Sequence, residues 1–206
     1  MTIIETLSDY FVNLDMEKVS DKTIEKVKLC IIDAVACCME TVTDSRCISA
    51  ENTVRERGKD RECTVIGRNW RTTASQAACL NAVRGSASSR NDLSRASGSH
   101  PGSVIIPAAL AEAEVRHADG IRLMKGILAG YEVMIRLGTI LMEAHLPSSF
   151  RMTAMTAPVG AATAAAVIRG LTPKQTASAI SFASNFCMGL NEWAWCGTGE
   201  DVYQAG

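Results

Sequence analysis

The sequence predicts a mainly α protein with at most one short strand. Apolar residues recur at helical spacing along most of the 206 residues, and only Cys63 to Gly67 has the short β-branched pattern of a strand. The chain is 47% hydrophobic and 21% charged, with a net charge of −1, as in ordinary globular domains. We therefore expect one large helical domain and neither a nucleic acid nor a membrane surface as its partner.

Two amphipathic helices are expected at the N-terminus. The first covers Thr2 to Leu14, and the second begins where Ser20 or Asp21 can cap its first turn. Apolar residues return every three or four positions in both: Ile3, Ile4, Leu7, Tyr10, Phe11 and Leu14 in the first, and Ile24, Val27, Ile31 and Val35 in the second. Both helices should therefore bury one face.

Further helices are predicted along the rest of the chain, over Ser75 to Val83, Val104 to His117, Gly120 to Glu143, Thr156 to Ile168 and Pro173 to Phe186. Thr172 should cap the last of them, with Pro173 in its first turn. The alanine-rich helix from Thr156 is shorter than the roughly 20 apolar residues that span a bilayer, so we interpret it as a core helix. The N-terminus does not resemble a signal peptide, and we expect a cytoplasmic protein.

The cysteines do not form a metal-binding pattern. No C-x-x-C pair or nearby histidine at ligand spacing accompanies any of Cys30, Cys37, Cys38, Cys47, Cys63, Cys79, Cys187 and Cys196. In a reducing compartment such thiols behave as small apolar residues, so we expect most of them in the core. The alternative of a catalytic thiol concerns Cys196 alone, because it lies in the glycine-bearing segment Trp195 to Gly199.

The segment from Ser88 to Glu112 joins a polar loop to an apolar helix and is the strongest candidate for a functional site. Pro101 restricts the backbone of His100 to extended angles, which directs the imidazole. Gly102 and Ser103 suit a turn and a helix cap, and Pro107 fits near the first turn of that helix. The start of the helix, with Arg90, Arg95 and His100, would attract a carboxylate or phosphate. The alternative is an ordinary solvated loop.

Several motifs together resemble the MmgE/PrpD family, which includes 2-methylcitrate dehydratases, cis-aconitate decarboxylases and iminodisuccinate epimerases. The motifs are Asn91-Asp92 followed by His100-Pro101-Gly102-Ser103-Val104-Ile105-Ile106-Pro107, then Gly130-Tyr131-Glu132-Val133, Arg136-Leu137-Gly138, the small residues 160–166, and Gly170-Leu171-Thr172. The resemblance implies the large helical domain of this family and a homodimer. Because family members are longer, residues 1–206 would be its N-terminal part, without the α+β second domain and the C-terminal helical part.

The resemblance also implies roles for individual residues. His100 matches an active-site histidine and is the expected acid or base near neutral pH, with Asp92 orienting it and Tyr131 and Tyr203 as weaker proton donors. Polar and cationic side chains are expected to bind substrate carboxylates, namely Arg90, Asn91, Ser94, Arg95, Ser103 and Arg151. The remaining histidines, His117 and His145, lie at predicted helix ends and are expected to be solvated or to act as C-caps.

Three positions depart from the family pattern. Arg90 stands where the dehydratase-like loop Asp-Phe-Asp-Asp-Thr-His has its first acid, Arg151 replaces a histidine, and Glu200, Asp201 and Val202 occupy the place of an expected lysine. Arginine keeps the positive charge of a histidine but cannot readily release a proton. These departures argue against a simple transfer of the 2-methylcitrate activity.

The leading hypothesis is a lyase that needs no cofactor or metal. It would be a hydro-lyase of the 2-methylcitrate dehydratase type, acting on a small di- or tricarboxylate by proton abstraction next to a carboxylate. The first alternative is an isomerase of the iminodisuccinate epimerase type, which the altered loop favours. The second alternative is a non-catalytic helical fragment that dimerises.

Overall fold

The computed structural model describes residues 2–55, 62–145, 148–197 and 199–205, and it confirms the mainly α architecture. The α-helices are α1 (Ile3–Val12), α2 (Asp21–Glu40), α3 (Ser45–Arg55), α4 (Ala74–Ala87), α5 (Gly102–Arg116), α6 (Gly120–Glu143), α7 (Met152–Arg169), α8 (Pro173–Ala183) and α9 (Glu192–Cys196). The short 3-10 helices are η1 (Met16–Lys18), η2 (Ser184–Phe186) and η3 (Glu200–Ala205). Strands β1 (Cys63–Thr64) and β2 (Arg71–Thr72) pair antiparallel.

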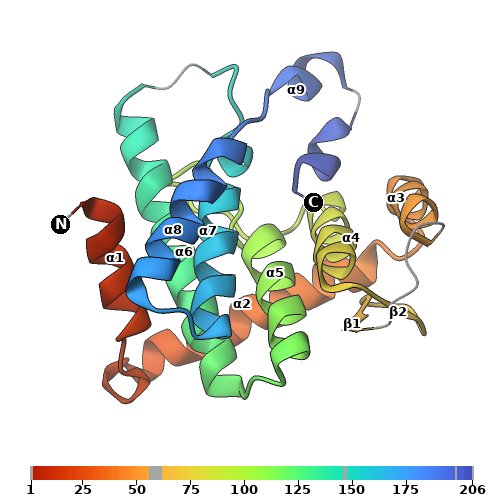
Figure 1. The fold of residues 1–206 in the computed structure, drawn as a ribbon. Coiled ribbons are helices and arrows are strands. Elements are labelled where there is room, and N and C mark those ends of the chain that lie inside the picture. Colours follow the sequence, from red (N-terminus) through yellow and green to blue (C-terminus); the bar gives the residue numbers. More distant parts are fainter. Residues whose placement is uncertain (1, 56–61, 146–147, 198, 206) are drawn as a thin grey trace.

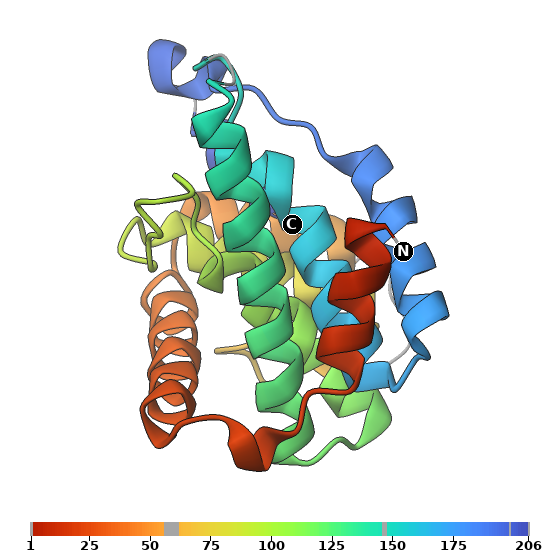
Figure 2. The ribbon, with the colours of Figure 1, turned by 90° about the vertical axis from the view of Figure 1, so that its left-hand side faces the viewer.

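Helices α6 and α7 pack side by side at the centre of the molecule, and α5 packs against both (Figure 1). Helix α4 packs on α5, with α3 and the small sheet beyond it. Turning the molecule by 90° places α2 on one side of α6 and the pair α1 and α8 on the other (Figure 2). The loop that joins α4 to α5 therefore lies close to α2, α6 and α7, where side chains from all of them can meet.

Small residues explain why α6 and α7 approach each other so closely. A Cβ added at Gly130 of α6 would lie 2.9 Å from the carbonyl oxygen of Gly160 in α7 and 3.0 Å from the Cβ of Ala164. The same addition at Gly126 would lie 2.9 Å from the carbonyl oxygen of Ala164. The interpretation of the small-residue segment as a core helix is therefore confirmed, and branched side chains such as Ile105 fill the space beside this contact.

The predicted helix ends are largely confirmed by their caps. Thr2 and Glu5 form a capping box at α1, Ser20 caps α2, and Thr172 and Gln175 form a second capping box at α8. His117 ends α5 in the left-handed conformation, with φ of 49°, and its N–H bonds to the last carbonyls of that helix.

Some predicted boundaries were wrong. Helix α5 begins at Gly102, so Pro107 lies in its second turn, and α7 begins at Met152, ahead of the predicted start. The predicted strand at Cys63 is confirmed only for two residues, and its partner β2 was not predicted. Helix α3 was missed because its buried face carries Cys47 and a charged residue, Glu51, in place of an apolar stripe. Helix α9, only five residues long, was missed as well.

Most of the cysteines lie in the core, as expected from the sequence. Cys30, Cys37, Cys38, Cys47 and Cys63 are buried, and burial raises the pKa of the Cys38 thiol to about 12. Cys196 is exposed at the end of α9. In the part of the chain that the structure describes, no helix combines the length and apolar character needed to cross a membrane.

Candidate functional site

The loop between α4 and α5 is held by its own hydrogen bonds. Ser94 and Ser99 exchange two backbone hydrogen bonds, with N to O distances of 2.9 and 3.3 Å. The hydroxyls of Ser97 and Ser99 lie 2.7 Å apart, and both residues are fully buried. An ordinary solvated loop would expose such serines, so this end of the loop is part of the folded core.

His100 is fixed at three of its atoms. Its Nδ1 lies 2.7 Å from the backbone carbonyl oxygen of Asp92, and its backbone N–H donates to the Thr153 hydroxyl at 3.1 Å. Its carbonyl accepts a hydrogen bond from the Ser103 hydroxyl at 3.1 Å. Because a carbonyl oxygen can only accept, Nδ1 carries the proton when the ring is neutral. Nε2 is then the nitrogen that can take up a proton and release it.

A cavity of about 340 Å³ lies beside His100. Residues from the α4–α5 loop, the start of α7 and the segment at α9 line it: Ser86, Ser89, Asn91, Gly98, His100, Arg151, Met152, Thr153, Asn191 and Trp193. The structure therefore brings together His100, Asn91 and Arg151, which the sequence analysis assigned to one site from distant parts of the chain.

Arg151 places a buried cation in this cavity. It directly precedes α7 and has only 8% of its surface exposed. Its guanidinium carbon lies 5.7 Å from the centre of the Trp193 ring, and Nη1 lies 3.5 Å from Oε1 of Gln204. A guanidinium held in this way retains its charge at all ordinary pH values, which suits it to hold a carboxylate.

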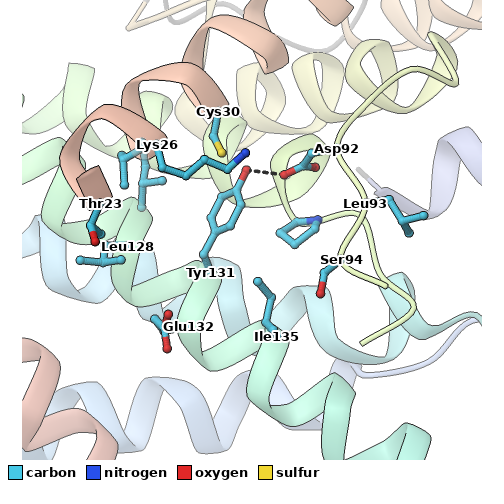
Figure 3. Close-up of a pocket in the computed structure, with 13 residues that line it drawn as sticks. Thr23, Lys26, Cys30, Asp92, Leu93, Ser94, Leu128, Tyr131, Glu132 and Ile135 are labelled. Carbon is cyan, nitrogen blue, oxygen red and sulfur yellow. Dashed lines mark hydrogen bonds between the residues drawn. The ribbon is translucent and has the colours of Figure 1, made fainter. Parts of the chain in front are cut away.

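The backbone carbonyl of Asp92 bonds to His100, whereas its carboxylate bonds to other elements. Oδ1 accepts the backbone N–H of Gly102 at 2.8 Å, and Oδ2 accepts the Tyr131 hydroxyl at 2.8 Å (Figure 3). Burial raises the pKa of Asp92, against the lowering effect of these two hydrogen bonds. Burial and the neighbouring Asp92 charge raise the pKa of Tyr131. The Asp92 carboxylate thus already occupies the start of α5, where the sequence predicted a site for an external anion.

The other predicted binding residues lie outside the His100 cavity. Arg90 is exposed and pairs with Glu40 at 3.0 Å, and Arg95 is exposed. Ser103 is buried, and its hydroxyl donates a hydrogen bond to the backbone carbonyl of His100. Ser94 lines a different cavity. The expected grouping of Arg90 and Arg95 with His100 around one anion is therefore not formed, because the loop directs the two arginines to the surface.

Several lining residues were not predicted from the sequence. Ser86 and Trp193 each carry a buried donor, Oγ and Nε1, that lacks a hydrogen-bond partner among the described residues. Thr153 and Asn191 help to shape the cavity, Thr153 by accepting the His100 N–H and Asn191 by donating to the carbonyl of Phe150 at 3.1 Å. Thr153 follows Arg151 by two positions in the segment that resembles a family motif, whereas Ser86, Asn191 and Trp193 belong to no motif, so only the folded chain reveals those three.

Comparisons with known proteins identify the family of this chain. Residues 5–202 match the model of the MmgE/PrpD N-terminal domain. The chain is also similar to a cis-aconitate decarboxylase-like protein of Aspergillus oryzae, with 26% identity over 192 residues, which cover 89% of this chain and 40% of that relative. The chain thus spans less than half the length of the relative it matches. With the family model covering nearly all of its residues, the chain belongs to the MmgE/PrpD family and contains the N-terminal domain of that family.

Proposed function

We propose that this protein is a lyase that acts on a small di- or tricarboxylate, with His100 as its acid and base. The observation that carries the proposal is the pairing of His100 with the buried Arg151 across one small cavity. The hydrogen bond from Nδ1 to Asp92 leaves Nε2 as the nitrogen for proton transfer. The volume of about 340 Å³ lies at the lower end for ligand pockets and suits a small substrate.

The cavity supplies what proton transfer next to a carboxylate requires. Arg151 can hold a substrate carboxylate and stabilise the enolate-like charge that develops when a neighbouring carbon loses its proton. The buried donors of Ser86 and Trp193, which have no hydrogen-bond partner within the described part of the chain, can bind anionic oxygens nearby. His100 Nε2 would take the proton from carbon, and the electron pair would move toward the carboxylate held by Arg151.

Two subclasses of lyase follow from this chemistry. The hydro-lyase of the 2-methylcitrate dehydratase type needs a base for the carbon-bound proton and an acid for the departing hydroxyl. Decarboxylation needs less, because loss of CO₂ leaves the bonding electron pair on carbon and one acid then protonates it. Among the described residues that line the cavity, only His100 carries an imidazole, carboxyl or phenol group, and this observation favours decarboxylation as the second candidate. The name of the Aspergillus oryzae relative agrees with it.

Proton NMR in D₂O tests the proposal on the protein as its gene encodes it. The substrates are citrate, 2-methylcitrate, cis-aconitate and precursors of iminodisuccinate. An alkene formed from a hydroxy acid identifies the dehydratase, and CO₂ loss with one deuteron incorporated identifies the decarboxylase. Exchange of a carbon-bound proton without elimination would favour the epimerase instead. Silence with every substrate from the folded protein contradicts the proposal and favours the non-catalytic alternative.

His100→Ala should abolish the turnover found in this panel and lower the melting temperature by only about 2 to 4 °C, because the lost hydrogen bond to the Asp92 carbonyl contributes about 1 kcal/mol. The matched control is His117→Ala, since His117 caps the far end of α5. Full activity of His100→Ala would overturn the assignment.

Arg151→Ala should raise KM by roughly 10- to 100-fold, the loss expected when a charged hydrogen-bond donor to substrate is removed. The matched control is Arg95→Ala, because Arg95 is exposed and does not line the cavity. Equal KM values for the two variants would show that Arg151 does not hold the substrate. The homodimer implied by the family resemblance remains a prediction.

A further inference from the structure

We propose that the side chains of Asp92 and Tyr131 form a positioning pair that sets the tautomer and direction of His100. Neither side chain lines the His100 cavity, so neither is expected to touch the substrate. The effect of this pair on turnover rests on the proposed function, whereas its effect on the tautomer of His100 does not.

Asp92 connects three elements through three short hydrogen bonds. Its backbone carbonyl accepts from His100 Nδ1 at 2.7 Å, Oδ1 accepts from the Gly102 N–H at 2.8 Å, and Oδ2 accepts from the Tyr131 hydroxyl at 2.8 Å. The carbonyl and the carboxylate belong to the same residue and are linked through its Cα. Anchoring the carboxylate to α5 and α6 therefore holds the carbonyl that selects the protonated nitrogen of His100.

The structure leaves room for this pair only because residue 102 is a glycine. A Cβ added there would lie 2.8 Å from Asp92 Oδ1 and 2.8 Å from the Tyr131 oxygen, closer than real side chains allow. The loop acid, the tyrosine and the first turn of α5 thus meet at one crowded point. The negative carboxylate at the start of α5 is also favoured by the helix dipole.

The pair lines a second cavity, of about 290 Å³, between α2 and α6 (Figure 3). Lys26 and Cys30 of α2 lie near the Tyr131 hydroxyl, and Ser94 of the loop lies at another edge. This cavity shares no lining residue with the His100 cavity. Asp92 therefore acts on His100 from outside the substrate cavity, through its main chain.

The Asp92 carboxylate could also serve only to cap the first turn of α5, without any effect on His100. The test must therefore measure directly which nitrogen of the His100 imidazole carries the proton. The chain has three histidines, and the ring nitrogens of each can be observed by 15N NMR after labelling. Signals are assigned with His117→Gln and His145→Gln. In the unsubstituted protein, we expect the neutral ring of His100 to carry its proton on Nδ1, facing the Asp92 carbonyl.

Tyr131→Phe removes one hydroxyl and leaves the ring packing in place. We expect His100 to shift toward a mixture of tautomers, and kcat to fall roughly tenfold or more with little change in KM, because the ring that transfers the proton is misaligned. Asp92→Ala should produce a larger shift, and Asp92→Asn should restore the Nδ1–H form, since an amide oxygen can still accept from Gly102. The matched control is Tyr10→Phe, since Tyr10 of α1 is exposed and lines neither the His100 cavity nor the cavity beside Asp92.

The positioning role would be overturned if His100 kept its proton on Nδ1 in both Tyr131→Phe and Asp92→Ala. If Asp92→Ala does not fold, Tyr131→Phe alone decides, because it deletes a single oxygen atom. A tautomer shift with unchanged turnover upholds the positioning role and shows instead that His100 is not the base of the reaction. The spectroscopic and kinetic measurements therefore separate failure of this inference from failure of the proposed function.

Discussion

A buried ion cluster between α3 and α4 provides a sharp test of what holds the fold together. The Glu51 side chain is 7% exposed and accepts hydrogen bonds from Arg68, and it also lies 3.3 Å from the guanidinium of Arg84. Arg84 is 1% exposed and donates to the carbonyl of Ile66, and its Nη2 is the atom that lies 3.3 Å from Glu51 Oε1. Glu51 is therefore the counter-charge on which the buried Arg84 depends.

Glu51→Gln should destabilise the protein by about 3 kcal/mol at pH 7, because removal of one partner of a buried pair leaves the other charge uncompensated. For a domain of this size the melting temperature should then fall by about 6 to 12 °C. Glu132→Gln is the matched control. Glu132 pairs with Arg136 at 2.8 Å but is 41% exposed, so its loss should cost less than about 1 kcal/mol.

The pH dependence of this difference follows from the Glu51 carboxyl. Burial alone would raise its pKa, but the hydrogen bond from Arg68 and the charge of Arg84 outweigh burial and lower the pKa below the ordinary value. A carboxyl with a lowered folded-state pKa stabilises the fold above its unfolded pKa, about 4.3, and loses that contribution as the pH falls through the folded value. The difference between unsubstituted protein and Glu51→Gln should therefore be constant from about pH 7 to pH 5 and shrink below about pH 4.

Urea unfolding followed by circular dichroism measures both effects, with the free energy of unfolding compared at each pH. The reasoning would be refuted if Glu51→Gln and Glu132→Gln lowered the free energy of unfolding by the same small amount at pH 7. The charge of Arg84 would then not depend on Glu51. A loss for Glu51→Gln that grows on acidification would refute the assigned sign of the pKa shift.

Two further predictions concern packing and thiol burial. Gly130→Ala should lower the free energy of unfolding in urea by about 1 to 3 kcal/mol, because the added Cβ would lie 2.8 Å from Ile105 Cγ2. Gly120 has open space around it, so Gly120→Ala should change that free energy by less than about 0.5 kcal/mol. Equal effects would contradict the close packing of α6 and α7. In the native protein a thiol reagent should label the exposed Cys196 and spare Cys38, and mass spectrometry that finds Cys38 labelled before unfolding would contradict its burial.

The sequence by itself determined the helical architecture and the position of the loop. Apolar periodicity and caps such as Thr2, Ser20 and Thr172 depend on neighbours within one or two turns, so they can be read without tertiary contacts. The same holds for His100 before Pro101, since proline restricts the residue that precedes it. Helix α3 could not be predicted from apolar periodicity, because Glu51 on its buried face pairs with arginines that lie elsewhere in the sequence.

The contacts of each polar side chain, in contrast, depend on how the helices and loops pack together. The sequence grouped Arg90, Arg95 and Arg151 with His100, but the fold exposes Arg90 and Arg95 and leaves only Arg151 beside the His100 cavity. The partners of Asp92 could not be predicted either, since its carboxylate bonds to Tyr131, 39 positions along the chain. Periodicity shows which face of a helix is buried, whereas the direction of a loop side chain depends on how distant segments pack around it.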